Sequence, residues 1–295
     1  MKERWLHIDV DSLFVKTVQE FFDDFIPSKK MQHLLIQNKW ILLDGNPVKR
    51  EDDIVGLKLQ LNIYPDDHVY EKNGLKCDIC YEDEIMVAVN KPKDLIVHSD
   101  GSDEMSLTRM LESYYADRSY VDCLPLHRLD KQTGGLVLFS KSGVFQPLLD
   151  RYMSEKTIRR NYLAFVEGRM EVGKIFTIDK PIGKDRHDAK KRIVHKDGQK
   201  AITKVRVVAC NKARNYSVLL CTLDTGRTHQ IRVHLASEGY PIINDDLYGS
   251  SASLCKRMGL FAESIELYHP LKEDSMTIEA QLPSDLEMLY LEALR

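Results

Sequence analysis

Hydrophobic and polar positions follow two different periods along the chain. After about residue 80, apolar and β-branched runs typical of β-strands occur at 85–89, 136–139, 161–166, 202–209, 216–223 and 276–282. Apolar residues at helical spacing lie between them, at 107–115 and 144–153. This mixture of strands and helices predicts an α+β domain over residues 79–295.

The N-terminal segment, residues 1–66, has a different pattern and is predicted to form a small separate module. Residues 11–25 carry apolar side chains at helical spacing, and Ser28 can cap a second helix. Asp44-Gly45 then lies between two short strand-like runs, as in a tight hairpin turn. We therefore expect a helix, a second helix and a hairpin, followed by a polar linker at 67–78.

The composition is that of a globular protein, with 43% hydrophobic and 29% charged residues, and this argues against disorder. No apolar run approaches the roughly 20 residues that a membrane helix needs. The first ten residues mix charged and apolar side chains and lack the apolar core of a signal peptide. We expect a cytoplasmic protein that does not associate with membranes.

Charge is unevenly distributed, although the formal net charge is only −3. Residues 180–214 contain twelve Lys/Arg and three Asp, a local charge of +9. Residues 263–295 contain eight acidic and two basic residues, a local charge of −6. A charge run is often only a solvated face, but a basic block in an acidic molecule favours a surface that binds phosphates.

The cysteines give little indication of a metal site. Cys77 and Cys80 have C-x-x-C spacing, but a structural zinc site needs four ligands and the other four cysteines are isolated. Cys210 and Cys221 lie in apolar runs and are expected to be buried as small hydrophobic residues. We therefore expect no metal and no disulfide framework.

A charged turn precedes one of the most apolar strands. The segment 127–136 reads His-Arg-Leu-Asp-Lys-Gln-Thr-Gly-Gly-Leu, and Val137 to Phe139 follow it. The two glycines permit a tight turn and a close approach to the backbone. Asp130 is therefore predicted at the edge of a sheet, where its carboxylate is either ion-paired for structure or positioned for chemistry.

A second polar segment, 225–234, reads Thr-Gly-Arg-Thr-His-Gln-Ile-Arg-Val-His and joins a strand end to a helix. The helix is predicted from Thr228 to about Ser237, with Gly239 as its C-terminal stop. A helix N-terminus favours anions, and two arginines add positive charge there. This segment predicts a site for an anion or a carboxylate.

These two segments, in this order, resemble signatures of the RluA/RluD family of RNA pseudouridine synthases. Further similar motifs are Asn90-Lys91-Pro92 with Val97-His98, Tyr162 to Gly168, Pro181-Ile182-Gly183, Asp245 to Gly249, and His269-Pro270 with Leu282-Pro283. The resemblance covers about residues 80 to 290. The sequence departs from the family pattern at Gly134, at Asp94 or Leu95, and at Asn244, all of them loop positions.

The resemblance implies a catalytic domain built on a mixed, mainly antiparallel sheet. It also implies that residues 1–66 are an αL-type RNA-binding module, although Ser28-Lys29 and Gly56-Leu57 match that motif loosely. The implied activity is isomerisation of uridines in structured RNA to pseudouridine, without a cofactor or metal. Ribosomal RNA is the favoured partner, transfer RNA is the alternative, and a monomer is expected.

Three catalytic residues are carried over from the matching motifs. Asp130 is expected to act as nucleophile or ion-pairing group at the bond between ribose and base. Arg227 is expected to pair with Asp130 and keep it ionised. Tyr162 is expected either to place its ring on the base or to place its hydroxyl near the departing proton, although its strand alone would suggest a core aromatic residue. Attack on the sugar, attack on the base and elimination across the sugar all remain open as routes.

The remaining predicted residues concern RNA binding and support. Arg128 lies two residues before Asp130, projects to the same side in extended chain, and is expected to fill the space left by a flipped nucleotide or to bind its phosphate. His229 and Gln230 are expected to support the site through hydrogen bonds. The other residues expected to contact RNA are Lys29, Lys30, Lys190, Lys191, Arg192 and Arg232.

Two other functions compete with an RNA-uridine isomerase. An RNA-binding or ribosome-assembly factor on the same scaffold would have no turnover, but it would not need Asp130, Tyr162 and Arg227 together. A glycoside or nucleoside hydrolase would need a second positioned carboxylate. Asp122 and Glu167 are near in sequence, but neither lies in a motif.

Overall fold

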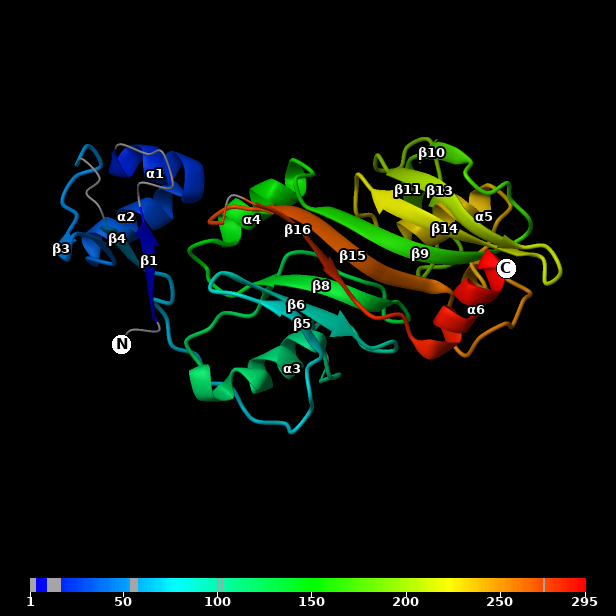
Figure 1. The fold of residues 1–295 in the computed structure, drawn as a ribbon, viewed down its shortest axis with the longest axis horizontal. Helices are drawn as coiled ribbons and strands as arrows, with labels where there is room; N and C mark the ends of the chain where they lie inside the picture. Colours follow the sequence, from blue (N-terminus) through cyan, green and yellow to red (C-terminus); the bar gives the residue numbers. More distant parts are fainter. Residues whose placement is uncertain (1–3, 10–16, 54–57, 100, 102, 273) are drawn as a thin grey trace.

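The computed structural model describes residues 4–9, 17–53, 58–99, 101, 103–272 and 274–295. Two sheets organise these residues, a small one near the N-terminus and a large one in the rest of the chain. They lie at different positions along the longest axis of the molecule (Figure 1).

The large sheet has the strand order β10-β13-β14-β9-β15-β8-β6-β5, with β16 paired to β15 and β7 paired to β8. All pairs are antiparallel except β15 with β8, so the expected mixed, mainly antiparallel sheet is confirmed. The strands are β5 (Ile79–Glu82), β6 (Met86–Lys91), β7 (Leu124–Pro125), β8 (Gly134–Ser140), β9 (Arg159–Glu167), β10 (Ile175–Asp179), β13 (Ile202–Asn211), β14 (Tyr216–Leu223), β15 (Leu260–His269) and β16 (Asp274–Glu279). A separate hairpin pairs β11 (Ile182–Lys184) with β12 (Arg192–Val194).

Four α-helices accompany this sheet: α3 (Leu107–Tyr114), α4 (Gln146–Ser154), α5 (Gln230–Ser237) and α6 (Ser284–Leu294). Helix α3 begins where Ser106 caps the backbone N–H of Arg109. Helix α4 begins two residues later than predicted, after Phe145, with a proline in its first turn.

Helices α5 and α6 cover opposite faces of the sheet. Cys221 of β14 pairs with Tyr162 of β9, so both side chains share one face. Tyr216, an odd number of residues away on β14, projects to the other face and donates its hydroxyl to Leu289 O of α6 at 2.7 Å. His234 of α5 instead contacts Thr203 at 2.9 Å, on the face of Tyr162. Helix α5 therefore delivers its polar side chains to the face that carries Tyr162.

Strand β15 lies between β8 and β9 at the centre of the sheet, yet its apolar pattern did not predict a strand. Glu263, Ser264 and Glu266 interrupt the run of hydrophobic residues. The structure shows why they are tolerated there: the amide of Asn161 on β9 donates to the side chains of Ser264 and Glu266.

The small sheet has the order β1-β4-β2-β3 and comprises β1 (Trp5–Asp9), β4 (Lys58–Asn62), β2 (Ile41–Leu43) and β3 (Asn46–Pro47). It is accompanied by α1 (Val18–Phe25) and α2 (Lys29–Gln37). The Ser28 cap and the turn at Asp44-Gly45 are confirmed. Residues 11–16 of the first predicted helix lie outside the described residues, and α1 begins after Thr17, whose side chain caps it. Strands β1 and β4 were not predicted.

Residues 67–78 contain no helix or strand, but they hydrogen-bond to the large domain. His68 Nε2 lies 2.6 Å from a carboxylate oxygen of Asp122, and the hydroxyl of Tyr70 donates to Val121 O at 2.9 Å. Just before them, the hydroxyl of Tyr64 donates to Glu84 O. These hydrogen bonds attach the segment between the two sheets to the large domain.

Candidate active site

Asp130 lies in the loop that enters β8, and the glycines after it determine how this loop meets the sheet. A side chain at Gly135 would be placed 2.2 Å from Ala262 O of β15, and Gly135 has a φ of +112°. Only glycine permits this close approach of the two strands. The backbone N–H of Thr133 donates to Asp130 O at 3.0 Å, which closes the turn. The carboxylate is thereby held at the end of the strand pair, with 23% of its side chain exposed.

Arg232 of α5 is the arginine that pairs with Asp130. Its Nη1 lies 3.3 Å from Asp130 Oδ2. Its Nε and Nη2 donate to both carboxylate oxygens of Asp245, at 2.7 and 2.8 Å. The Arg232 and Asp245 side chains are only 3% and 1% exposed. A two-bond contact of this kind fixes the plane of a guanidinium, so Asp245 aims the rest of Arg232 at Asp130.

The predicted ion pair between Arg227 and Asp130 is wrong. Arg227 is exposed on the loop before α5, and its Nε donates to Lys200 O at 3.1 Å. Arg232 lies inside the helix, among buried residues from Gln230 to Leu235. The sequence contained a signal for this difference, because an arginine within an apolar helical segment needs a buried carboxylate partner.

His229 immediately precedes α5 in a left-handed conformation, with a φ of +59°. Its Nε2 lies 3.8 Å from Asp130 Oδ2, and its Nδ1 lies 2.8 Å from the hydroxyl of Tyr248. Burial lowers the pKa of His229, although the nearby Asp130 carboxylate opposes that shift. The imidazole is therefore neutral at pH 7. A non-glycine residue in this conformation is strained, and such strain is concentrated at functional sites.

Gln230 holds the loop before α5 and does not contact Asp130. Its amide nitrogen donates to Ile202 O and to Thr203 Oγ1, at 2.9 and 3.0 Å. Its Oε1 accepts from the Thr225 hydroxyl and from the backbone N–H of Arg227, at 2.7 and 3.1 Å. This is a supporting position of the kind that was expected for Gln230.

Tyr162 is buried on β9, on the same face of the sheet as α5. Burial raises the pKa of its hydroxyl, Arg160 two residues earlier lowers it, and Asp130 raises it. The structure thus brings Tyr162 and Asp130 within electrostatic range, and the phenol keeps its proton at neutral pH.

Lys91 is a buried cation near Asp130 that sequence reasoning did not assign to the site. Its ammonium donates to the carbonyls of Pro92, Leu95 and Lys131, at 3.0, 2.7 and 3.1 Å. Burial lowers the pKa of Lys91 to about 8, against the opposing effect of Asp130. The contact with Lys131 O ties the end of β6 to the residue that follows Asp130. The only sequence signal was the Asn-Lys-Pro motif itself.

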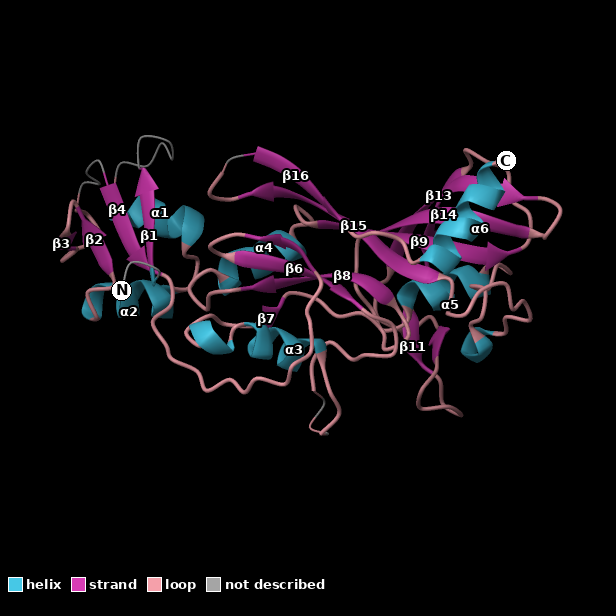
Figure 2. Ribbon diagram, turned by 60° about the horizontal axis from the view of Figure 1, so that its bottom comes forward, coloured by secondary structure: helices cyan, strands magenta, loops and turns pink. Residues whose placement is uncertain are grey.

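The basic residues 190–192 lie beside this site. The β11–β12 hairpin contacts α5, and both lie at the end of the molecule opposite the small sheet (Figure 2). The backbone N–H of Arg192 donates to the Tyr248 hydroxyl at 2.9 Å, and Lys191 Nζ lies 5.7 Å from the centre of the Tyr248 ring. Lys190 is exposed.

The other residues that were predicted to contact RNA lie in several parts of the molecule. Arg128 is exposed two residues before Asp130. Lys29 and Lys30 are exposed on α2, at the far end of the molecule from α5 (Figure 1). The basic block 180–214 is divided, because β13 carries its last residues away from the hairpin, to where Arg214 pairs with Glu292 at the α6 end.

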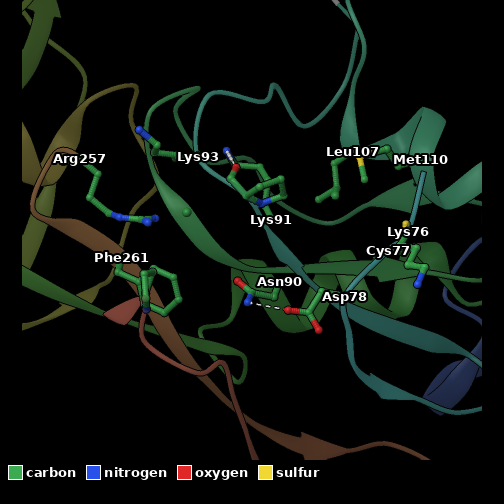
Figure 3. Close-up of a pocket in the computed structure, with 13 residues that line it drawn as sticks. Lys76, Cys77, Asp78, Asn90, Lys91, Lys93, Leu107, Met110, Arg257 and Phe261 are labelled. Atoms are coloured by element: carbon green, nitrogen blue, oxygen red, sulfur yellow. Dashed lines mark hydrogen bonds between the residues drawn. The ribbon is translucent and has the colours of Figure 1, made fainter. Parts of the chain in front are cut away.

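A cavity of about 230 Å³ lies near the start of β8, lined by residues that include Asn90, Lys93, Arg257 and Phe261 (Figure 3). Phe261 pairs with Leu163, whereas Ala262 pairs with Tyr162. Phe261 therefore projects to the face opposite Tyr162. Phe261 lines the cavity from that other face, and Asp130 is not among the lining residues.

Within the described ranges, no group of three or more His, Cys, Asp or Glu side chains is arranged to hold a metal ion. Burial raises the pKa of the Cys77 thiol to about 11, and the pKa of Cys80 is also raised, first by burial. Both thiols are therefore protonated at neutral pH in the metal-free protein. None of the described helices is both long enough and apolar enough to cross a membrane.

Comparison with known proteins supports the motif-based resemblance. The family described as RNA pseudouridylate synthase matches residues 85–237. The uncharacterized RNA pseudouridine synthase YhcT of Bacillus subtilis is 36% identical over 72% of this chain and 70% of its own length. The ribosomal large subunit pseudouridine synthase D of Escherichia coli K12 is 31% identical over 92% of this chain and 87% of its own length.

A solved structure is similar in fold. Human RNA pseudouridylate synthase domain containing 1 superposes with a TM-score of 0.59 and 21% identity, over 72% of this chain and 87% of that one.

Proposed function

This chain belongs to the RluA/RluD family of RNA pseudouridine synthases and is therefore an isomerase that acts on RNA. From this premise, we propose that Asp130 performs the reaction and that the substrates are uridines of large-subunit ribosomal RNA. The observation that supports the role of Asp130 most directly is its ion pair with Arg232, which Asp245 holds in place. The ribosomal substrate is inferred from relatives that carry it in their names.

The reaction requires little beyond positioned protein groups. The bond between N1 of uracil and C1′ of ribose breaks, the base turns, and C5 bonds to C1′. N1 ends with a proton, and C5 loses one. Nothing is oxidised or reduced and no group is added. Every route open to Asp130, whether attack on the sugar, attack on the base or elimination, is served by an ionised, oriented carboxylate.

Arg232 holds the carboxylate of Asp130 in place. Its guanidinium is already paired with Asp245, so it presents a fixed positive charge at 3.3 Å from Asp130 Oδ2. Such a preformed charge needs no rearrangement when charge develops in the transition state. The backbone N–H of Arg227 donates to Gln230, and its side chain is exposed on the loop. Arg227 is therefore better suited to contact RNA than to pair with Asp130.

Tyr162 and Arg128 are proposed to contact the target nucleotide. A uridine stacked in RNA cannot reach a carboxylate at the edge of a sheet, so the nucleotide must flip out of its helix. Tyr162 then places its ring and protonated hydroxyl at the base. Arg128, exposed beside Asp130, occupies the vacated space or binds the nucleotide's phosphate.

Two further surfaces are proposed to bind RNA. One is the β11–β12 hairpin with Lys190, Lys191 and Arg192, which lies next to the site. The other is the N-terminal module, residues 1–66, with Lys29 and Lys30 exposed on α2. Since the two surfaces lie at opposite ends of the long axis, the RNA must be large enough to extend along the molecule (Figure 1). A folded ribosomal RNA fragment meets that need, and we expect a monomer in the cytoplasm to bind it.

The test is pseudouridine mapping of total RNA from cells lacking the gene, rescued with wild type, Asp130→Asn or Asp246→Asn. Asp246 is an exposed neighbour of Asp245 and serves as the matched control. We expect one or a few sites in large-subunit ribosomal RNA to vanish, and to return with wild type and Asp246→Asn only. Restoration by Asp130→Asn would remove Asp130 from its role. Loss of sites only in transfer RNA would refute the ribosomal substrate.

A further inference from the structure

We propose that Tyr248 is a positioning residue that connects the β11–β12 hairpin to Asp130 through the ring of His229. This inference rests on the proposed role of Asp130. It concerns contacts among three segments that are far apart in sequence: the start of β12, the loop at Asp245 to Gly249, and the entry to α5.

The hydroxyl of Tyr248 has two polar neighbours. It accepts a hydrogen bond from the backbone N–H of Arg192 at 2.9 Å. It also lies 2.8 Å from His229 Nδ1. Burial raises the pKa of Tyr248, so the hydroxyl keeps its single proton at neutral pH. Since the oxygen already accepts from Arg192, the proton is free to be donated to His229 Nδ1.

The other nitrogen of His229 indicates the same proton arrangement. Nε2 lies 3.8 Å from Asp130 Oδ2, and a carboxylate favours an N–H over a lone pair at that position. Burial lowers the pKa of His229, and Arg232 and Arg192 act in the same direction, whereas the carboxylates of Asp130 and Asp245 raise it without reversing the shift. The ring is therefore neutral, with its proton on Nε2 facing Asp130 and its Nδ1 accepting from Tyr248.

The Tyr248 ring is held from several sides, so the hydroxyl has little freedom. The guanidinium of Arg232 lies 5.0 Å from the ring centre and the ammonium of Lys191 lies 5.7 Å from it. The His229 ring meets it edge-on, with centroids 5.7 Å apart. Cation–π and edge contacts of this kind survive removal of the hydroxyl. Tyr248→Phe therefore removes the hydrogen-bond connection alone.

Two consequences follow for the reaction. Without the Tyr248 hydroxyl, the Nδ1–H tautomer of His229 becomes accessible, and its Nε2 lone pair then faces the Asp130 carboxylate. Asp130 then faces a lone pair at 3.8 Å in place of an N–H, while Arg232 stays in place. Because the Arg192 backbone N–H is the other partner of this hydroxyl, movement of the hairpin on binding RNA is transmitted to the same ring.

The experiment has a measurement on the free protein and one on turnover. In protein labelled with ¹⁵N-histidine, the signals of the two His229 nitrogens, assigned with His229→Asn, show which one carries the proton. Turnover is followed as tritium released from C5 of uridine in a large-subunit ribosomal RNA transcript, under single-turnover conditions. The variants are Tyr248→Phe and, as matched control, Tyr240→Phe, whose ring packs over Gly168 outside the site.

We expect the wild type and Tyr240→Phe to hold the proton on Nε2. In Tyr248→Phe, we expect a shift toward Nδ1, a turnover rate lower by about tenfold, and RNA affinity within about twofold of wild type. Protonation of Nδ1 in the wild type, or an unchanged tautomer or rate in Tyr248→Phe, would overturn the proposal. The wild-type tautomer is measured on the free protein without a substrate, so an unmodified transcript would count against the ribosomal substrate and leave this inference to be judged on the free protein.

Discussion

The end of the molecule that carries α5 and the end that carries α2 hold charged side chains in opposite ways. Around α5, Arg232 and Asp245 are 3% and 1% exposed and meet at 2.7 Å. At the other end, Lys29 lies 3.7 Å from Asp23, and these side chains are 74% and 60% exposed. A buried charge has lost its water and depends on its partners, whereas an exposed charge keeps its hydration. The buried pair therefore holds its side chains in a fixed geometry, as a reaction requires. The exposed pair suits salt-dependent contact with phosphates.

The largest effect is expected from a substitution in the buried pair of Arg232 and Asp245. Asp245→Asn removes the carboxylate that pairs with Arg232, and we expect the free energy of unfolding to fall by about 3 kcal/mol. Asp23→Asn, at the exposed pair with Lys29, should change it by less than about 1 kcal/mol. Urea unfolding of both variants measures the difference. Equal losses would contradict the contrast between the two ends.

A smaller effect concerns histidines at the two ends. Burial lowers the pKa of His127, near Asp130, to about 3. The unfolded chain therefore takes up a proton at this residue below about pH 6.5, while the folded protein does not until about pH 3. The contribution of the neutral His127 to the free energy of unfolding is therefore fully present above about pH 6.5. It is lost as the pH falls from there toward about pH 3.

The free energy of unfolding falls when the pH is lowered from 6 to 4. We expect this fall to be smaller by about 2 kcal/mol in His127→Gln than in the wild type. Glutamine can still accept the N–H of Leu138, which His127 Nε2 accepts at 3.2 Å. His33→Gln, at an exposed position on α2, is the control and should retain the wild-type pH dependence. Unfolding by urea across this pH range gives the slopes, and identical slopes for the two variants would rule out the assignment to His127.

The third effect tests which part of the divided basic block contacts RNA. Reversing Lys190, Lys191 and Arg192 to Glu should weaken RNA binding at least tenfold. It should also reduce the slope of log affinity against log salt by about 2 to 3, since about three phosphate contacts are lost. Lys212→Glu with Arg214→Glu, at the other end of β13, should leave the slope nearly unchanged. A larger change in the control pair would place the RNA path along the α6 end.

The smallest effect is expected at the N-terminal module. Lys30→Ala should lower affinity for a large ribosomal RNA fragment by about twofold and reduce the salt slope by at most about 1. The same variant should leave affinity for a short hairpin carrying the target uridine unchanged, because the hairpin does not extend to α2. Filter binding at several salt concentrations distinguishes the two RNAs, and equal losses on both would indicate that the module binds next to the target uridine.

Much of the fold was predictable because its signals are local. Ser28 caps α2, Asp44-Gly45 forms the hairpin turn, and the run from Tyr216 to Leu223 is a strand with the predicted bounds. Strand β15 was missed because polar residues interrupt its apolar run, and their partners lie on β9, about a hundred residues earlier. Pattern reasoning recognises burial by apolar side chains, but it cannot recognise burial satisfied by a distant amide.

The sequence by itself determined the chemical groups of the site: a carboxylate, Asp130, before a buried strand, a tyrosine in the next motif, and a cationic segment before and within a helix. Only the tertiary structure decided how they pair. It placed Arg232 rather than Arg227 against Asp130, 102 residues away in the chain, and it joined Arg192 to Tyr248 across 56 residues. The physical reason is that an ion pair or hydrogen bond depends on distances of a few ångströms, and the packing of strands and helices sets those distances, whereas spacing along the chain does not.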